Sequence, residues 1–75
     1  MEIKEFVVNF AEQFDGADIE TFNASTKFRE QEEWSSLVAL SIIAMIDEEY
    51  DISIPGEKLR ELDTIEDVFN FIRGL

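Results

Sequence analysis

The chain has 75 residues, a formal net charge of −12 and neither cysteine nor histidine. A chain of this length supports one small domain, because such a domain buries only about 60% of the surface that its unfolded chain exposes. Without cysteine or histidine, a disulfide framework and thiolate or imidazole zinc sites are excluded, and the usual general base of enzymes is missing. The negative charge opposes binding to nucleic-acid phosphates and anionic lipids, so we expect no nucleic-acid partner.

The composition is that of a folded protein and not of a disordered acidic tail. Hydrophobic residues make up 45% of the chain and include seven phenylalanines, which can supply a core. The absence of a basic N-terminal region and of a long apolar segment predicts neither a signal peptide nor a membrane span. We therefore expect a cytoplasmic monomer with one domain over residues 1–75. Its acidity favours partners with basic patches, although acidity also serves plain solubility.

Residues 3–14 are expected to form the first helix, because apolar side chains recur there every three or four positions. The apolar positions are Ile3, Phe6, Val7, Phe10 and Phe14. Asp15 and Gly16 end this pattern. Residues 15–34 have no helical period but keep the apolar residues Ile19, Phe22, Phe28 and Trp34. This segment is therefore predicted to be a long loop that its apolar side chains hold against the domain.

The second expected helix, residues 36–50, follows Ser35 as its N-cap and is apolar around most of its circumference. The positions best suited to the core are Ile42, Ile46 and Tyr50, with Ala39 and Ile43 beside them. The other apolar positions are Leu37, Leu40 and Ala44 on a flank, and Val38 and Met45 on further faces. Because so short a chain cannot cover every face, we expect an exposed apolar strip bordered by acids.

The last third of the chain predicts an extended connection, a short helix and a longer one. Residues 52–55 form the connection, and residues 56–62 provide one or two helical turns. Thr64 and Asp67 make a capping box ahead of a final amphipathic helix that ends at Gly74. The expected fold is therefore all-α, a small four-helix bundle with three main helices and one short helix.

Two acidic patterns do not predict a metal site or an enzyme. Residues 47–51 resemble a calcium loop in charge, but they lack its alternating ligands, its central glycine and its terminal glutamate. Paired carboxylates along exposed helices without a cleft are more typical of a solvated face than of a glycosidase. We expect no metal ligand and no catalytic residue.

The order of elements and several motifs resemble the acyl carrier protein family over the whole chain. The motifs are Trp34-Ser35-Ser36-Leu37, the ridge from Ile42 to Tyr50, Asp47-Glu48-Glu49-Tyr50-Asp51 and Ile52-Ser53-Ile54-Pro55. Family members carry Asp-Ser-Leu at the start of the second helix, and 4′-phosphopantetheine from coenzyme A esterifies their serine. Ser36, directly before Leu37, is the matching residue. The resemblance implies a carrier of thioester-bound acyl groups in fatty-acid, polyketide or related pathways, and not an enzyme.

The position of Ser36 also has a physical rationale. A phosphodiester at the first turn of a helix meets free backbone N–H groups and the positive end of the helix dipole. Since no histidine is present to activate it, Ser36 is expected to be a passive substrate of a phosphopantetheinyl transferase. On local grounds alone, a serine at a helix start is more often only a cap. Ser35 replaces the family's usual aspartate, preserves capping without the charge, and is the second candidate for attachment.

The family's partner-binding surface lies on the second helix and the loop after it. The matching positions in this chain are Leu37, Leu40, Ala44, Asp47, Glu48 and Ile54. The resemblance implies that apolar contacts hold acyl-loading and acyl-processing enzymes there, while carboxylates steer their basic patches. For Leu37 and Leu40, core filling is an equal alternative. The alternative function for the whole chain is an unmodified acidic adaptor that binds a partner through this helix without a prosthetic group.

Overall fold

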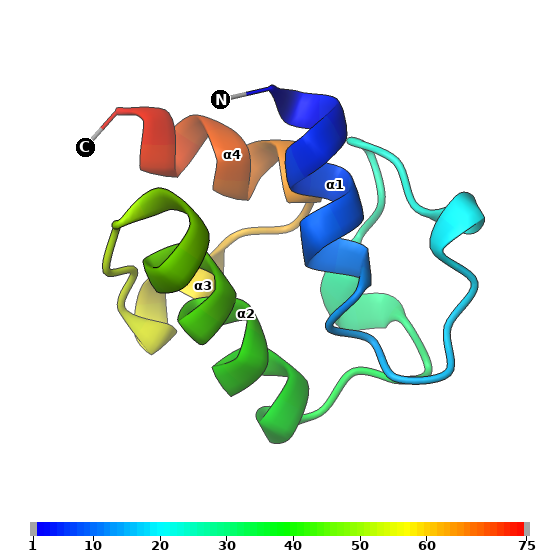
Figure 1. Cartoon of the computed structure of the whole chain (residues 1–75). Helices are drawn as coiled ribbons and strands as arrows, with labels where there is room; N and C mark the ends of the chain where they lie inside the picture. Colours follow the sequence, from blue (N-terminus) through cyan, green and yellow to red (C-terminus); the bar gives the residue numbers. More distant parts are fainter. Residues whose placement is uncertain (1, 75) are drawn as a thin grey trace.

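The computed structural model describes residues 2–74, and in this range it contains four α-helices, two short 3₁₀ helices and no β-strand (Figure 1). The α-helices are α1 (Ile3–Ala11), α2 (Ser36–Tyr50), α3 (Gly56–Glu61) and α4 (Ile65–Arg73). The 3₁₀ helices η1 (Ile19–Thr21) and η2 (Phe28–Glu30) lie in the long connection between α1 and α2. The expected all-α fold, with three main helices and one short helix, is confirmed.

The helices pack as a small bundle in which α1 contacts both α4 and α2, and α2 contacts α3. The start of α1 and the end of α4 lie at the same end of the molecule (Figure 1). The connection between α1 and α2 occupies the side away from α3 (Figure 1). The chain therefore crosses this side of the bundle before it enters α2.

Backbone hydrogen bonds tie the long connection to the segment between α3 and α4. The Phe28 N–H donates to the Asp63 carbonyl at 3.3 Å, and the Ile65 N–H donates to the Thr26 carbonyl at 3.2 Å. The Arg29 side chain adds a hydrogen bond to the Leu62 carbonyl at 3.0 Å. The predicted loop is thus packed and paired, which explains how so long a connection remains ordered in a small domain.

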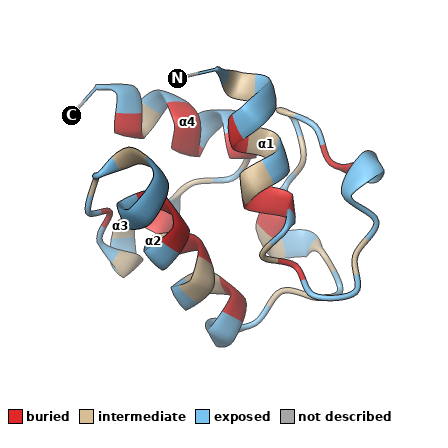
Figure 2. Ribbon diagram, viewed as in Figure 1, coloured by how far each residue is buried: buried red, intermediate tan, exposed pale blue. Residues whose placement is uncertain are grey.

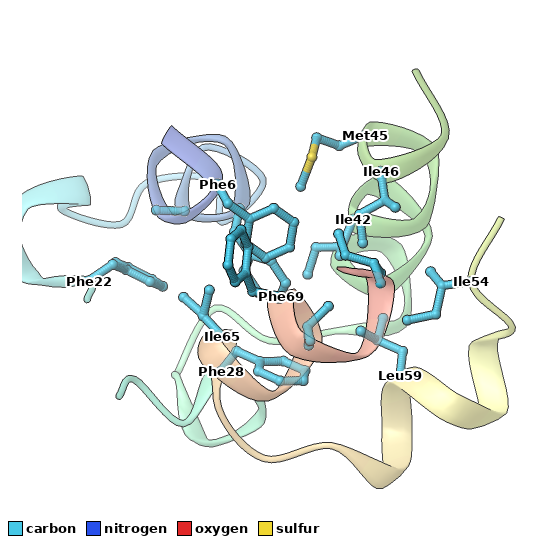
Figure 3. Close-up of a cluster of buried hydrophobic side chains, with 14 of the residues drawn as sticks. Phe6, Phe22, Phe28, Ile42, Met45, Ile46, Ile54, Leu59, Ile65 and Phe69 are labelled. Atoms are coloured by element: carbon cyan, nitrogen blue, oxygen red, sulfur yellow. The ribbon is translucent and has the colours of Figure 1, made fainter. Parts of the chain in front are cut away.

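Aromatic rings from three segments make up a large part of the core (Figure 3). Phe6 of α1 packs on Phe69 of α4 with ring centroids 5.5 Å apart. Phe10 packs edge to face on Phe28 at 5.1 Å, and Phe28 packs in the same way on Trp34 at 5.5 Å. These tilted and edge-on arrangements suit the charge distribution of aromatic rings. Through Trp34, the ring cluster reaches the residue just before Ser35, the N-cap of α2.

Helix α1 is shorter than its apolar pattern predicts. It ends at Ala11, and the next turn is made by i to i−3 hydrogen bonds, including one from the Phe14 N–H to the Ala11 carbonyl. Phe14 is nevertheless 2% exposed, because it packs on Phe22 with ring centroids 5.1 Å apart. Gly16 then takes a positive φ of 85°, which glycine adopts without steric cost.

The buried face of α2 differs in part from the predicted one (Figure 2). Ile42 and Ile46 are fully buried as expected. Val38 and Met45, which the sequence placed on further faces, are each only 7% exposed and belong to the core. The predicted core neighbours Ala39 and Ile43 are only partly buried. The buried stripe is rotated in this way because α1 covers the side of α2 that carries Met45, whereas the short α3 leaves the opposite side partly open.

The remaining boundaries agree closely with the sequence. Helix α2 begins at Ser36 and ends at Tyr50, and Asp51 follows in the left-handed conformation with φ 56°. Helix α3 ends at Glu61, one residue before the predicted end. The predicted capping box of α4 is present, because the Asp67 N–H donates to Thr64 Oγ1 at 3.1 Å and the Thr64 N–H donates to Asp67 Oδ2 at 3.1 Å.

Candidate functional site

The two serines before Leu37 occupy different structural positions. Ser35 is the N-cap of α2 in extended conformation, and its Oγ accepts a hydrogen bond from the Val38 N–H at 3.2 Å. Ser36 is the first residue of the helix and is exposed. No side-chain hydrogen bond within residues 2–74 involves the Ser36 hydroxyl. Ser35 therefore has a structural role in the helix, while the Ser36 oxygen is accessible.

The first turn of α2 offers a favourable setting for a negative group. The Val38 N–H is used by Ser35 Oγ, and the Ala39 N–H donates to the Ser35 carbonyl at 3.0 Å. The N–H groups of Ser36 and Leu37 precede these and have no intrahelical acceptor. The first turn carries no acidic side chain. The positive end of the helix dipole at Ser36 is therefore not neutralised by a neighbouring carboxylate in that turn.

A groove of about 250 Å³ lies between α2 and α3, and Ser36 is one of the residues that line it. Its apolar lining comes from Trp34, Ala39, Leu40 and Ile43, and Arg60 of α3 contributes its charged group. Sequence reasoning missed this groove and the part that Trp34 and Arg60 play in it. No sequence signal marks them, because the groove arises only from the way α3 packs beside α2.

Five of the six predicted docking positions lie on one exposed strip of α2. The strip consists of Leu37, Leu40, Ala44, Asp47 and Glu48. Leu37 is 73% exposed and Leu40 is 63% exposed, so neither fills the core. Their spacing of three or four residues places them on the same helix face, starting beside Ser36. The alternative reading of both leucines as core filling is wrong.

Ile54 does not belong to this surface. Only 3% of it is exposed, and it packs within the hydrophobic cluster beside Leu59 (Figure 3). The left-handed Asp51 reverses the chain after α2, and the extended connection that follows turns Ile54 inward. The prediction that Ile54 is available to a partner is therefore corrected, and its side chain serves the core.

Two side chains away from Ser36 have perturbed pKa values. Burial raises the pKa of the Tyr50 hydroxyl, which also accepts a hydrogen bond from Asn9 Nδ2 at 3.0 Å. The hydrogen bond from the Thr64 N–H lowers the pKa of the Asp67 carboxyl. Neither group is hydrogen-bonded to Ser36, so neither acts as a base that would activate its hydroxyl.

In the described part of the chain, no group of three acidic side chains is arranged to hold a metal ion. No helix there is long and apolar enough to cross a membrane.

Comparison with known proteins identifies the family. The chain matches the family described as "Phosphopantetheine attachment site" over residues 5–72. It is also 32% identical over 57 residues to the acyl carrier protein of Kocuria rhizophila, an alignment that covers 76% of this chain and 70% of that protein. The chain belongs to the acyl carrier protein family. No solved structure gives a significant match to this carrier.

Membership of this family gives the carrier its role and its cofactor, which is a covalently attached 4′-phosphopantetheine that bears acyl groups. The residues present at the start of α2 fit such a group. An exposed serine hydroxyl stands at a helix N-terminus, and a groove with apolar walls and one cationic side chain begins beside it. The hydroxyl suits a phosphodiester, and the apolar walls suit the carbon chain that follows it.

Proposed function

We propose that residues 1–75 form one carrier unit that holds acyl intermediates as thioesters on a 4′-phosphopantetheine arm attached to Ser36. The observation that supports Ser36 most directly is the difference between the two serines. The Ser35 oxygen accepts a hydrogen bond that caps α2, whereas the Ser36 oxygen is exposed and makes no such bond within residues 2–74. Attachment at Ser36 therefore leaves the helix cap intact.

The attachment reaction needs a separate enzyme. Within residues 2–74, no side chain is hydrogen-bonded to the Ser36 hydroxyl to take its proton, and the chain has no histidine. A phosphopantetheinyl transferase would supply the base, join Ser36 Oγ to the phosphorus of the arm and release the nucleotide half of coenzyme A. The contribution of this chain is to present the hydroxyl at the positive end of α2, where an anion gains about 0.3–1 kcal/mol.

We further propose that the exposed strip of α2 docks the transferase and the enzymes that load and process the acyl group. Leu37 and Leu40 present apolar surface next to Ser36, and Asp47 and Glu48 present carboxylates about two turns beyond Leu40. A partner with an apolar contact ringed by basic residues complements this strip. Docking there brings a partner's active site close to the root of the arm.

Intact-mass measurement tests the attachment site. The wild-type chain, Ser36→Ala and Ser35→Ala are each incubated with coenzyme A and a broad-specificity transferase. Wild type and Ser35→Ala are expected to gain the mass of one arm, and Ser36→Ala is expected to gain none. Circular dichroism of each variant shows whether it is folded. A gain that persists in Ser36→Ala would move the site to another residue, with Ser35 first, and no gain in wild type would favour the unmodified adaptor.

A further inference from the structure

Among residues 2–74, Arg60 is the one charged side chain that lines the groove beside Ser36. The other side chains along this groove are apolar, apart from the Ser36 hydroxyl itself. Arg60 extends from α3, so the groove combines a cation from one helix with the attachment residue of another. The groove has a volume of about 250 Å³, and both Ser36 and Arg60 line it.

The guanidinium of Arg60 is available to a ligand. Two other cations are paired, Arg29 with Asp63 at 2.9 Å and Lys58 with Glu61 at 3.7 Å, whereas no ion pair within residues 2–74 involves Lys4, Lys27 or Arg73. Within residues 2–74, no carboxylate lies within 4.0 Å of Arg60, even though the chain holds eighteen acidic residues. The first turn of α2 also carries no acid. The first turn of α2 therefore places no carboxylate of its own beside the Ser36 hydroxyl, and the nearest acids along the chain are Glu32 and Glu33.

We propose that Arg60 binds the phosphodiester of the arm and thereby seats the first part of the arm in this groove, against Trp34. The inference rests on the proposed attachment at Ser36. The phosphodiester is the first charged group of such an arm, and its bond to Ser36 Oγ would place it beside the groove that Ser36 and Arg60 both line. A guanidinium presents a planar fork of N–H donors that matches phosphate oxygens. The apolar walls then cover the carbon segment that follows the phosphate.

The alternative ligand for the Arg60 guanidinium is a carboxylate at the far end of the acyl group that the arm carries. It reaches Arg60 only if the whole arm folds back along the groove. The phosphodiester needs no such folding, because it is fixed at Ser36. The two sources are separated by loading the arm with a succinyl group, which carries a terminal carboxylate, or with a pentanoyl group, which does not.

The test compares wild type with Arg60→Gln, Arg60→Lys and the control Lys58→Gln, which changes a cation of the same helix that pairs with Glu61 and lies over the Phe71 ring. Intact mass first establishes that each protein bears the arm. Fluorescence then reports on Trp34, the single tryptophan of the chain, before and after attachment. The ³¹P linewidth reports on the mobility of the phosphodiester.

Attachment is expected to change Trp34 emission in wild type and in Lys58→Gln. Arg60→Gln should reduce the seated population about two- to fivefold, which is the scale of an exposed charge pair, and should narrow the ³¹P line. Arg60→Lys should retain part of the effect, because it keeps the charge but not the fork. Added salt should diminish the difference between wild type and Arg60→Gln.

Succinyl and pentanoyl forms are expected to show the same dependence on Arg60. An effect of Arg60→Gln confined to the succinyl form would overturn the phosphodiester assignment in favour of the cargo carboxylate. Equal fluorescence and linewidth in wild type and Arg60→Gln, with both bearing the arm, would overturn any role of Arg60 while leaving attachment at Ser36 intact. Absence of a mass gain in wild type would overturn both proposals.

Discussion

At the scale of single residues, adjacent serines have separate tasks because one side chain turns back to the helix and the other does not. The Ser35 oxygen satisfies the Val38 N–H, which would otherwise lack an acceptor. The Ser36 oxygen accepts no hydrogen bond from a backbone N–H within residues 2–74. Modification chemistry and helix stability can therefore be changed independently by substitutions one residue apart.

Ser35→Ala should lower the free energy of unfolding by about 1 kcal/mol, which is the typical cost of losing an N-cap. Ser36→Ala should change it by less than about 0.5 kcal/mol, as expected for an exposed position. Urea denaturation followed by circular dichroism measures both values. If Ser36→Ala proved as costly as Ser35→Ala, its hydroxyl would have a structural role that the hydrogen bonds do not show.

Asp67 makes the stability of the carrier sensitive to acid. Its folded-state pKa is lowered, chiefly because the Thr64 N–H donates a hydrogen bond to the carboxylate. The stabilisation is therefore fully present above the unfolded-state pKa of about 3.9. It is lost as the pH falls through the lower folded-state pKa. Asp67→Asn should be less stable than wild type at neutral pH and should lose less stability on acidification.

Thermal unfolding at a series of pH values from neutral downward measures this dependence. The matched control is Glu66→Gln, which removes a carboxylate from the same first turn but leaves the capping box in place. The Glu66→Gln variant should keep the acid dependence that Asp67→Asn reduces. An Asp67→Asn variant with the same pH profile as wild type would show that the capping box contributes nothing to the acid response.

At the scale of elements, helix α2 divides into a buried stripe, an exposed strip and a groove wall. Its limits and its cap were predictable because local signals specify them, namely Ser35 before the apolar run and the acids at its end. Which face of α2 enters the core was not predictable, because the helix is apolar on most sides and the spacing of its apolar residues selects no single face. Only the positions of α1 and α3 decide that Val38 enters the core while Leu40 stays exposed.

Ile54→Ala and Leu40→Ala should therefore have opposite consequences. Ile54→Ala should destabilise the fold by about 2–5 kcal/mol, because it removes buried methyl groups and leaves a cavity. Leu40→Ala should cost less than about 0.5 kcal/mol in stability. It should instead lower the kcat/KM of the transferase about fivefold or more, as expected for an apolar contact at the centre of an interface.

Chemical denaturation and transferase kinetics on the same two proteins separate these effects. Asp51→Asn is a further control, which should keep the stability of wild type, because asparagine also tolerates the left-handed conformation observed at that position. A Leu40→Ala variant that folds normally and reacts at the wild-type rate would remove Leu40 from the docking surface. A stable Ile54→Ala variant would contradict its place in the core.

At the scale of the whole molecule, the net charge of −12 on a small domain generates self-repulsion that the fold must overcome. The ion pairs Arg29–Asp63 and Lys58–Glu61 are both partly solvent-accessible and relieve little of it. Sodium chloride should therefore raise the melting temperature up to roughly physiological ionic strength, where the screening length is about 8 Å. Differential scanning calorimetry in a salt series measures this, and a melting temperature that falls with added salt would contradict it.

The overall fold was predictable to the extent that local patterns encode it. The capping box at Thr64 and the period of α4 are readable in sequence, and both are present in the structure. The early end of α1, the inward turn of Ile54 and the groove at Arg60 depend on contacts between distant segments. These features bear most directly on function, because they decide which apolar groups remain open to a partner or to the arm.

The central claim is that Ser36 bears the arm, and tandem mass spectrometry of the transferase-treated wild-type chain tests it most directly. Trypsin cleavage after Arg29 and Lys58 releases residues 30–58 as one peptide, which contains Ser35, Ser36, Ser41 and Ser53. Fragments that break the chain between Ser35 and Ser36 assign the added mass to one side. We predict that every fragment retaining Ser36 carries the arm and that N-terminal fragments ending at Ser35 do not. An added mass on the Ser35 side, or on no fragment of this peptide, would contradict the account.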